Sequence, residues 1–434
     1  MKKIIEIKRI KCKSWSAIIY NVVVVLLCGL VTTDGSADDI RRGLRPLSAP
    51  NAISSVDWDA YWGDEKLVDP VSRQGQGARG LYFNSVVMRR IGAEGVIKAV
   101  RNARLDAAVI DLKDSEGRIL YQTKIGILQR LYKPYLRNAP EFVRRLRDAG
   151  VYTIGRIVCF SDPKVPRAYP DRAVLDARPR KKGKLWATWG GRNTWLDPYN
   201  GLNHDVVVQL AVEAEALGVN EIQLDYIRFP VDEATSFASF PAENDTPRRI
   251  VLLRLLRRID QAIGIPIGVD VFGLTALRRD DRAGLGQSLE DWARYVEVFT
   301  PMLYLNGMSV WAKGAKHQRA MRLVTAAVTQ LRRRLGHGPV IRPFLQAFPQ
   351  GADYYTPEFI DEQIRGARQG GADGFLFWHP GSNYVMVREG MNGPAHSIGP
   401  FSFDERYDWR VQAWSDGMSP VSRAVYFREM DRRR

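Results

Sequence analysis

Two aspartates, Asp225 and Asp270, lie near the carboxyl ends of predicted β-strands. In residues 221–230 apolar and polar side chains alternate with the period of a strand, and Asp225 falls near the end of the alternation. The same reading of residues 265–272 puts Asp270 near the end of another strand. A carboxylate in a strand that is buried on both faces is costly, and at the carboxyl end of a parallel strand it often marks a site.

The chemistry open to such a pair is general acid–base and nucleophilic catalysis. Neighbouring strands lie about 4.8 Å apart, so two carboxyls at adjacent strand ends can approach to the roughly 5–5.5 Å used by retaining glycosidases. Like charges in one site separate the two pKa values, so one carboxyl can stay protonated while the other is ionised. The alternative is structural: each aspartate is buried against an arginine or against backbone amides.

The elements that must position these residues alternate between strand and helix. A fold with this order is a single (β/α)₈ TIM barrel of about 300 residues. An open doubly wound sheet is the alternative, but no Gly-x-Gly-x-x-Gly turn follows the first strand. The predicted strands are 80–88, 107–112, 151–160, 221–227, 265–272, 298–305, 339–347 and 372–378. The main predicted helices are one through Val96 to Val100, then 140–149, 203–218, 247–263, 288–295, 316–335 and 356–370.

Further polar and aromatic residues near the predicted strand ends could orient a sugar. Asp111 is followed by Lys113, Asp114 and Glu116. Three roles are possible for Asp111: an internal ion pair, a contact with a ligand or, least favoured, a metal site. No Ser or Cys nucleophile motif accompanies the histidines and they form no metal-binding motif, so we expect neither a metal nor a cofactor. The candidate substrate-binding residues are Asp111, Arg156, Arg228, Tyr304, Trp378 and His379.

The chain is basic, with a formal net charge of +16. It shows no zinc-finger, ribonucleoprotein or helix-turn-helix signal, so a nucleic-acid partner is not expected. A basic run at 178–184 is followed by three tryptophans and lies in a long connection after the third strand. Such a segment can bind an anionic or sugar polymer, or it can be a solvated charge run. We therefore expect a carbohydrate as the partner, and an acidic carbohydrate is the more specific alternative.

The amino-terminal sequence is typical of an export signal. Basic residues precede an apolar run of about fifteen residues from Ala17, short for a membrane span, and Gly35-Ser36-Ala37 offers a cleavage site. The predicted parts are a signal or uncleaved anchor at 1–37, a polar linker at 38–79, the barrel at 80–396 and an extension at 397–434. Cleavage would leave Cys159 as the only cysteine, which suits an exported protein without disulfides.

Six short motifs resemble a bacterial family of glycoside hydrolase domains, barrels distantly similar to the α-amylase type. The resemblance covers roughly residues 78–390 and implies the fold and a glycosidase activity. By analogy with amylase-type barrels it matches Asp225 to the nucleophile on strand four, whereas Asp270 takes the place of a glutamate acid. Gln223 stands where those enzymes carry an arginine. The motifs are Gly80-Leu81-Tyr82, Asp111-Leu112-Lys113-Asp114, Trp195-Leu196-Asp197-Pro198, Leu224-Asp225-Tyr226-Ile227-Arg228-Phe229-Pro230, Asp270-Val271-Phe272-Gly273 and Pro301-Met302-Leu303-Tyr304.

Overall fold

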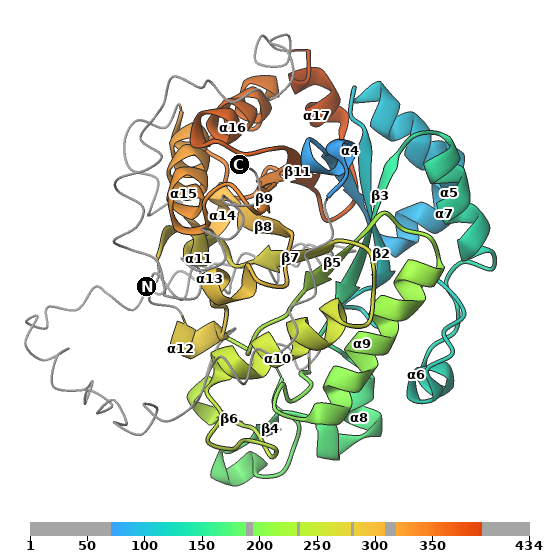
Figure 1. Ribbon diagram of the computed structural model, residues 1–434, viewed down its shortest axis with the longest axis vertical. Helices are drawn as coiled ribbons and strands as arrows, with labels where there is room; N and C mark the ends of the chain where they lie inside the picture. Colours follow the sequence, from blue (N-terminus) through green and yellow to red (C-terminus); the bar gives the residue numbers. More distant parts are fainter. Residues whose placement is uncertain (1–70, 188–193, 232–234, 279–281, 309–317, 393–434) are drawn as a thin grey trace, which may run out of the picture. The chain divides into compact units, whose positions relative to one another are not determined.

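The computed structural model describes residues 71–187, 194–231, 235–278, 282–308 and 318–392 (Figure 1). The predicted signal, most of the linker and the carboxyl-terminal extension lie outside these ranges. Within them, no helix has the length and apolar character needed to cross a bilayer.

The described chain forms a closed barrel of parallel strands with helices around it, which confirms the predicted (β/α)₈ fold (Figure 1). The strand order is β1-β2-β3-β5-β7-β8, then β9 and β10, which share the seventh position, and β11. The ring closes where β1 pairs with β11, Arg79 opposite Phe375. The strands are β1 Arg79–Phe83, β2 Ala107–Lys113, β3 Tyr152–Val158, β5 Glu221–Asp225, β7 Ile267–Val271, β8 Val298–Leu303, β9 Val340–Ile341, β10 Phe344–Gln346 and β11 Phe375–Trp378.

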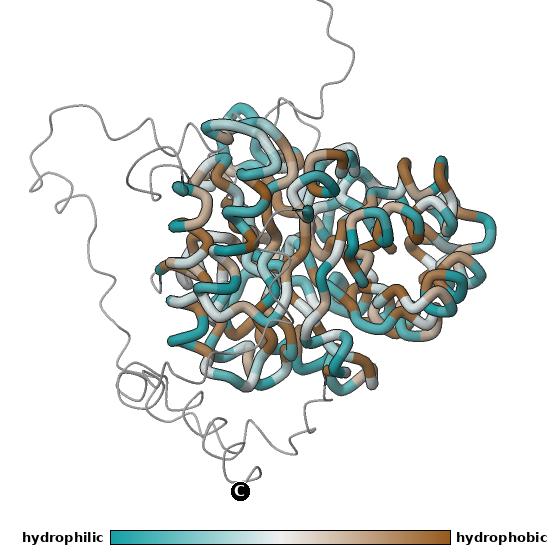
Figure 2. Tube along the Cα trace, turned by 90° about the horizontal axis from the view of Figure 1, so that it is seen from above, coloured by the Kyte–Doolittle hydropathy of each residue, from teal (hydrophilic) through white to brown (hydrophobic). Residues whose placement is uncertain are grey.

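The helices that flank the barrel begin and end at residues suited to those positions. Asn84 caps the first of them by accepting a hydrogen bond from the Val87 N–H, and Gly371, in the left-handed region, ends the last long one. In Figure 2 the coiled parts of the tube change repeatedly between teal and brown, as expected for helices with one face packed on the barrel. The longer helices are α5 Ser85–Asn102, α7 Ala139–Asp148, α9 Gly201–Ala216, α10 Arg248–Asp260, α15 Arg319–Leu335 and α16 Pro357–Gly370.

Short helices occupy the connections between the main elements. They are α4 Arg73–Gln76, α6 Gly126–Leu131, α8 Val165–Ala168, α11 Gly273–Leu277, α12 Arg282–Leu285, α13 Leu289–Trp292, α14 Leu305–Met308 and α17 Val385–Gly390, with 3₁₀ turns η2 Pro170–Arg172, η3 Pro179–Lys181 and η4 Thr235–Phe237.

The structure corrects several predicted boundaries. Strand one was expected to reach Met88, but it ends at Phe83, because Asn84 caps a helix there. Strand seven divides into β9 and β10 around Arg342 and Pro343, since proline has no N–H for the strand ladder. Helix α10 begins one residue later than predicted, and α13 spans only Leu289–Trp292.

The long connection after β3 contains structure that the sequence did not predict. In it, β4 Leu175–Asp176 pairs with β6 Ala238–Ser239, which comes from the connection after β5, in a two-stranded antiparallel sheet. Because β3 and β5 both end at the carboxyl rim of the barrel, this small sheet ties two rim connections together.

Strand phase divides most of the core between two clusters. Outward-facing residues such as Leu81, Ile110 and Val269 pack under the helices. Inward-facing residues such as Val109, Ile154 and Leu376 fill the barrel. The polar residues at the strand ends share this inward orientation, so their side chains meet near the barrel axis.

Candidate active site

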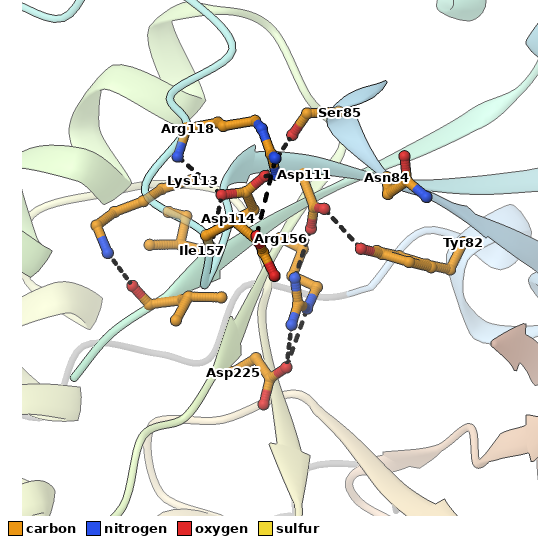
Figure 3. A network of polar contacts seen from close by, with 12 residues as sticks. Tyr82, Asn84, Ser85, Asp111, Lys113, Asp114, Arg118, Arg156, Ile157 and Asp225 are labelled. Carbon is orange, nitrogen blue, oxygen red and sulfur yellow. Dashed lines mark hydrogen bonds and ion pairs between the residues drawn. The ribbon is translucent and has the colours of Figure 1, made fainter. Parts of the chain in front are cut away.

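Arg156 is the centre of a buried polar network at the carboxyl ends of the strands (Figure 3). Its Nε and Nη2 both donate to Asp225 Oδ2, the former at 3.0 Å, and its Nη1 donates to Asp111 Oδ1 at 2.5 Å. Asp270 Oδ2 lies 3.9 Å from Nε. One guanidinium therefore faces three carboxyls, from β2, β5 and β7.

The two predicted catalytic carboxyls, Asp225 and Asp270, are close together. Because Arg156 Nε lies 3.0 Å from one Oδ2 and 3.9 Å from the other, these oxygens are at most about 7 Å apart. This limit covers the separation of retaining carboxyl pairs, about 5–5.5 Å, and only the lower edge of the inverting range, about 6.5–9.5 Å.

Asp270 differs from its neighbours because neither of its oxygens has a hydrogen-bond partner within the described chain. Its side chain is 1% exposed. Burial and then the nearby charge of Asp225 raise the pKa of Asp270 well above its usual value, more than Arg156 lowers it. Asp270 is therefore the carboxyl suited to hold a proton at neutral pH.

Asp225 is the most accessible of the three carboxyls, with 9% of its side chain exposed against 1% for Asp111 and for Asp270. Its Oδ1 accepts from the N–H of Tyr226 at 2.6 Å. Tyr226 has a φ of +51°, in the left-handed region that costs a non-glycine residue about 1–2 kcal/mol. This sharp turn at the end of β5 holds the carboxylate by its own backbone.

Asp111 is held from two sides. The hydroxyl of Tyr82 donates to its Oδ2 at 2.6 Å, while Arg156 occupies Oδ1 (Figure 3). Burial raises the pKa of Asp111 to about 6, against the opposing effect of Arg156. Asp111 and Arg156, which were predicted to bind substrate, thus contact each other and other protein groups.

Aromatic side chains form the other half of the rim. Trp378 is half-buried and lies 6.1 Å from Tyr82 in a stacked arrangement, 5.6 Å from Tyr304 and 5.4 Å from Phe348, measured between ring centroids. Tyr82 joins the two halves, because its ring meets Trp378 and its hydroxyl meets Asp111. A partly exposed ring at the same rim as the carboxylate cluster suits the apolar face of a sugar.

The other two candidate substrate residues have mainly protein contacts. The guanidinium of Arg228 is buried over the rings of Trp195, at 4.9 Å, and Tyr226, at 5.2 Å. His379 Nδ1 accepts from the N–H groups of Gly381 and Asn383, and burial lowers the pKa of His379 to about 4. The neutral imidazole thus shapes the turn that follows β11.

Lys113 and Asp114 do not join the central cluster, although they follow Asp111 closely in the sequence. A bulge between Asp111 and Lys113 turns the lysine away, and its Nζ lies 2.9 Å from Asp162. Asp114 accepts from Ser85 and Arg118. These buried groups fix the connections after β2 and β3.

No group of three or more His, Cys, Asp or Glu side chains in the described ranges is arranged to hold a metal ion. A surface pocket of about 460 Å³ lined by Gln74, Asp148 and Asn220, among others, lies at the amino ends of β3 and β5, opposite the carboxylate cluster. The cluster, and not this pocket, is the candidate site.

Sequence reasoning missed the roles of Tyr82 and Asp162. Tyr82 lies on the inward phase of strand one, and counting that phase could have placed it at the rim. Asp162 lies beyond the end of β3, where strand phase no longer applies, so its contact with Lys113 had no local signal.

The fold and the rim of carboxyl and aromatic side chains are those of a glycosidase-like barrel. Residues 80–384 match the family described as "Putative glycosyl hydrolase domain", and the chain belongs to that family. This confirms the family resemblance. No curated protein matches the chain.

Several solved structures are similar to the chain, and the first one named below shows the same fold. The glycoside hydrolase domain of PgaB (BpsB) from Bordetella bronchiseptica is 13% identical, with 74% of this chain and 99% of that one covered and a TM-score of 0.54. A hypothetical protein from Ruminiclostridium thermocellum is 26% identical over 44% of this chain and 97% of its own, with a TM-score of 0.39. The α-galactosidase TtGalA from Thermus thermophilus is 14% identical over 76% and 63%, with a TM-score of 0.47.

Proposed function

We propose that this protein is an exported glycoside hydrolase that cleaves a poly- or oligosaccharide with two carboxyls, Asp225 and Asp270. The proposal rests on one observation: both carboxyls lie beside the same guanidinium, that of Arg156, at the carboxyl end of a barrel. Asp225 keeps 9% of its side chain exposed and is hydrogen-bonded, while Asp270 is 1% exposed and has no hydrogen-bond partner in the described ranges. Such different surroundings separate acid from nucleophile.

In this mechanism Asp225 attacks the anomeric carbon while Asp270 gives its proton to the leaving oxygen. The resulting glycosyl ester at Asp225 is then hydrolysed by a water from which Asp270 takes a proton. The close spacing of the carboxyls favours this retaining route. Arg156 and Tyr226 position Asp225, Asp111 positions Arg156, and Trp378 offers an aromatic face to the sugar. The reaction requires no cofactor.

The low exposure of Asp270 favours a second candidate function, a glycan or cell-wall binding protein that does not catalyse. A general acid must reach the glycosidic oxygen, and a side chain that is 1% exposed needs substrate binding to open the site around it. Both candidates require a sugar at the rim. They differ in whether bonds are cleaved there.

A panel of bacterial exopolysaccharides, assayed for new reducing ends, distinguishes the two. We expect wild-type protein to release reducing ends, Asp225→Asn to lose at least about 1,000-fold in rate, and Asp270→Asn to lose activity mainly on substrates with poor leaving groups. Asp361→Asn, on the outer helix α16, is the matched control and should keep full activity. Equal activity of wild type and Asp225→Asn would reject the mechanism, and binding without cleavage would favour the second function.

Export is the other part of the proposal, and it rests on the amino-terminal sequence alone. A signal cleaved after about Ala37 would leave the barrel and its linker in the mature protein. Mass measurement of the protein purified from cell envelope and medium tests this. An intact amino terminus in the cytoplasmic fraction alone would contradict export.

A further inference from the structure

The connection after β3 contains a hairpin, residues 175–185, which we call the basic hairpin. Leu175 and Leu185 form an antiparallel bridge, and the N–H of Asp176 donates to the Lys184 carbonyl at 2.8 Å. On its other side, β4 pairs with β6 of the connection after β5. The hairpin is therefore part of a small sheet and not a loose loop.

The tip of the basic hairpin is also fixed by backbone hydrogen bonds. The N–H of Lys181 donates to the Arg178 carbonyl at 2.8 Å, and the N–H of Lys184 to the Lys181 carbonyl at 2.9 Å. Gly183 has a φ of +78°, which lets the chain reverse without strain. A fixed backbone presents the tip side chains from defined positions.

The tip carries cations that the described parts of the chain do not neutralise. Arg178 is paired with Asp176, whereas the four cations after it are exposed and have no acidic partner within 4 Å in those parts. Like charges on neighbouring side chains repel one another, and an anion bound at the tip would offset that repulsion. The four are Arg180, Lys181, Lys182 and Lys184.

We propose that the basic hairpin binds the acidic groups of an anionic polysaccharide. This deepens the proposed function, on which it rests in one respect: the bound polymer is taken to be the substrate. The hairpin belongs to the connection after β3 and pairs with that after β5, and both leave the barrel at the end that holds Asp225. A chain molecule can therefore contact the tip and the site together.

The surroundings of the tip favour a polysaccharide over a membrane or a nucleic acid. Residues 177–184 include no large apolar side chain that could insert into a bilayer. The aromatic ring beside them, Phe237, is 40% exposed, but the Arg178 guanidinium lies 5.4 Å from its centroid, and one ring with one face occupied is a poor platform for successive stacked bases. Flexible cations on a fixed tip suit the spaced carboxylates of an acidic glycan.

Binding of fluorescent oligogalacturonate to the full chain tests the proposal. We expect loss of three tip charges to weaken binding about tenfold, because exposed ion pairs contribute roughly 0.2–1 kcal/mol each, and we expect salt to weaken wild-type binding. A control that removes three exposed cations, one before β1, one on α5 and one just after α5, should stay within about twofold of wild type. The tip variant is Lys181→Gln/Lys182→Gln/Lys184→Gln and the control is Arg73→Gln/Lys98→Gln/Arg104→Gln.

The proposal is overturned if the tip variant binds like wild type, or if the control weakens binding equally, because the effect would then be one of total charge. It is also overturned if double-stranded DNA or phosphatidylglycerol vesicles bind the tip more tightly than the oligosaccharide. Asp225→Asn separates this proposal from the proposed function. That variant should bind oligogalacturonate normally, so full cleavage by it would reject the mechanism and leave the hairpin result intact.

Discussion

Buried charged side chains are paired differently at the two ends of the barrel interior. At the amino ends of the strands, Glu221 is paired with Arg342, both side chains are fully buried, and Tyr152 donates to the same glutamate. At the carboxyl ends, Arg156 faces three carboxyls. Balanced charge suits an end that seals the barrel, whereas an unbalanced cluster keeps protons available for chemistry.

The comparison also extends to how each end is covered. Arg342 donates to the carbonyl of Gly75 at 2.7 Å, so α4 is held beneath the barrel by the buried arginine. At the opposite end the cover consists of connections, among them the sheet of β4 and β6. The amino end of the barrel is thus sealed and the carboxyl end gives access to the site, as is general for barrels of this kind.

The largest effect is expected for Arg342→Met, which leaves Glu221 buried without its cation. Removing one partner of a buried pair costs about 3–5 kcal/mol, and urea unfolding at pH 7 measures the loss. Glu221→Gln/Arg342→Met should recover most of it, because no unpaired charge remains. A loss below about 1 kcal/mol in the single variant would contradict a sealing role for the pair.

Arg156→Met is the counterpart at the carboxyl end. We expect hydrolysis to fall at least about 100-fold, because Asp225 loses the two donors that hold its Oδ2. The loss of stability should be smaller at pH 5 than at pH 7, since the carboxyls left behind can take up protons. Unfolding curves at the two pH values test this, and an equal loss at both would place Arg156 with the sealing residues.

Glu297, beside the sealed end, gives a pH test. Burial raises the pKa of Glu297 from its ordinary 4.5 to about 8, while the N–H of Ile267 donates to it. The folded state therefore binds this proton more strongly, so its stabilising effect is present below pH 4.5 and lost as the pH rises through 8. Glu297→Gln should remove about 4 kcal/mol of that decline, measured by urea unfolding from pH 5 to 9. An unchanged decline would reject the assignment.

Asp111 should show the same sign over a lower pH window. Its pKa rises from 3.8 to about 6 on folding, so the stability from its protonated form disappears as the pH goes from about 4 to 6. We expect Asp111→Asn to flatten the stability profile by about 2 kcal/mol in that window and to leave the profile above pH 7 parallel to wild type. Thermal unfolding in matched buffers measures this, and a shift confined to alkaline pH would contradict it.

The smallest effect is expected for Trp378→Phe, at the aromatic half of the rim. The smaller ring should raise KM about fivefold with kcat within about twofold, because the contact forms in substrate and transition state alike. Steady-state kinetics on an oligosaccharide measure the split. A fall in kcat alone would mean that the ring acts on the reacting centre.

The barrel could be predicted because each strand and helix has its own period in the sequence. The inward phase also placed Asp225, Asp270, Asp111 and Arg156 at one rim. Their pairing could not be read in the same way, because it depends on side-chain reach across the barrel axis and on the bulge after Asp111. The sheet of β4 and β6 was missed because strands of two residues have no measurable period.

Closure of the ring by β1 and β11 has a consequence for synthesis. The paired residues Arg79 and Phe375 are separated by about 300 positions, which a ribosome translating roughly 5–20 residues per second needs about 15–60 s to cover. Throughout that time the edge of β1, with Leu81 and Phe83, has no final partner. A nascent chain of this kind is exposed to edge-to-edge association until its last strand has been made.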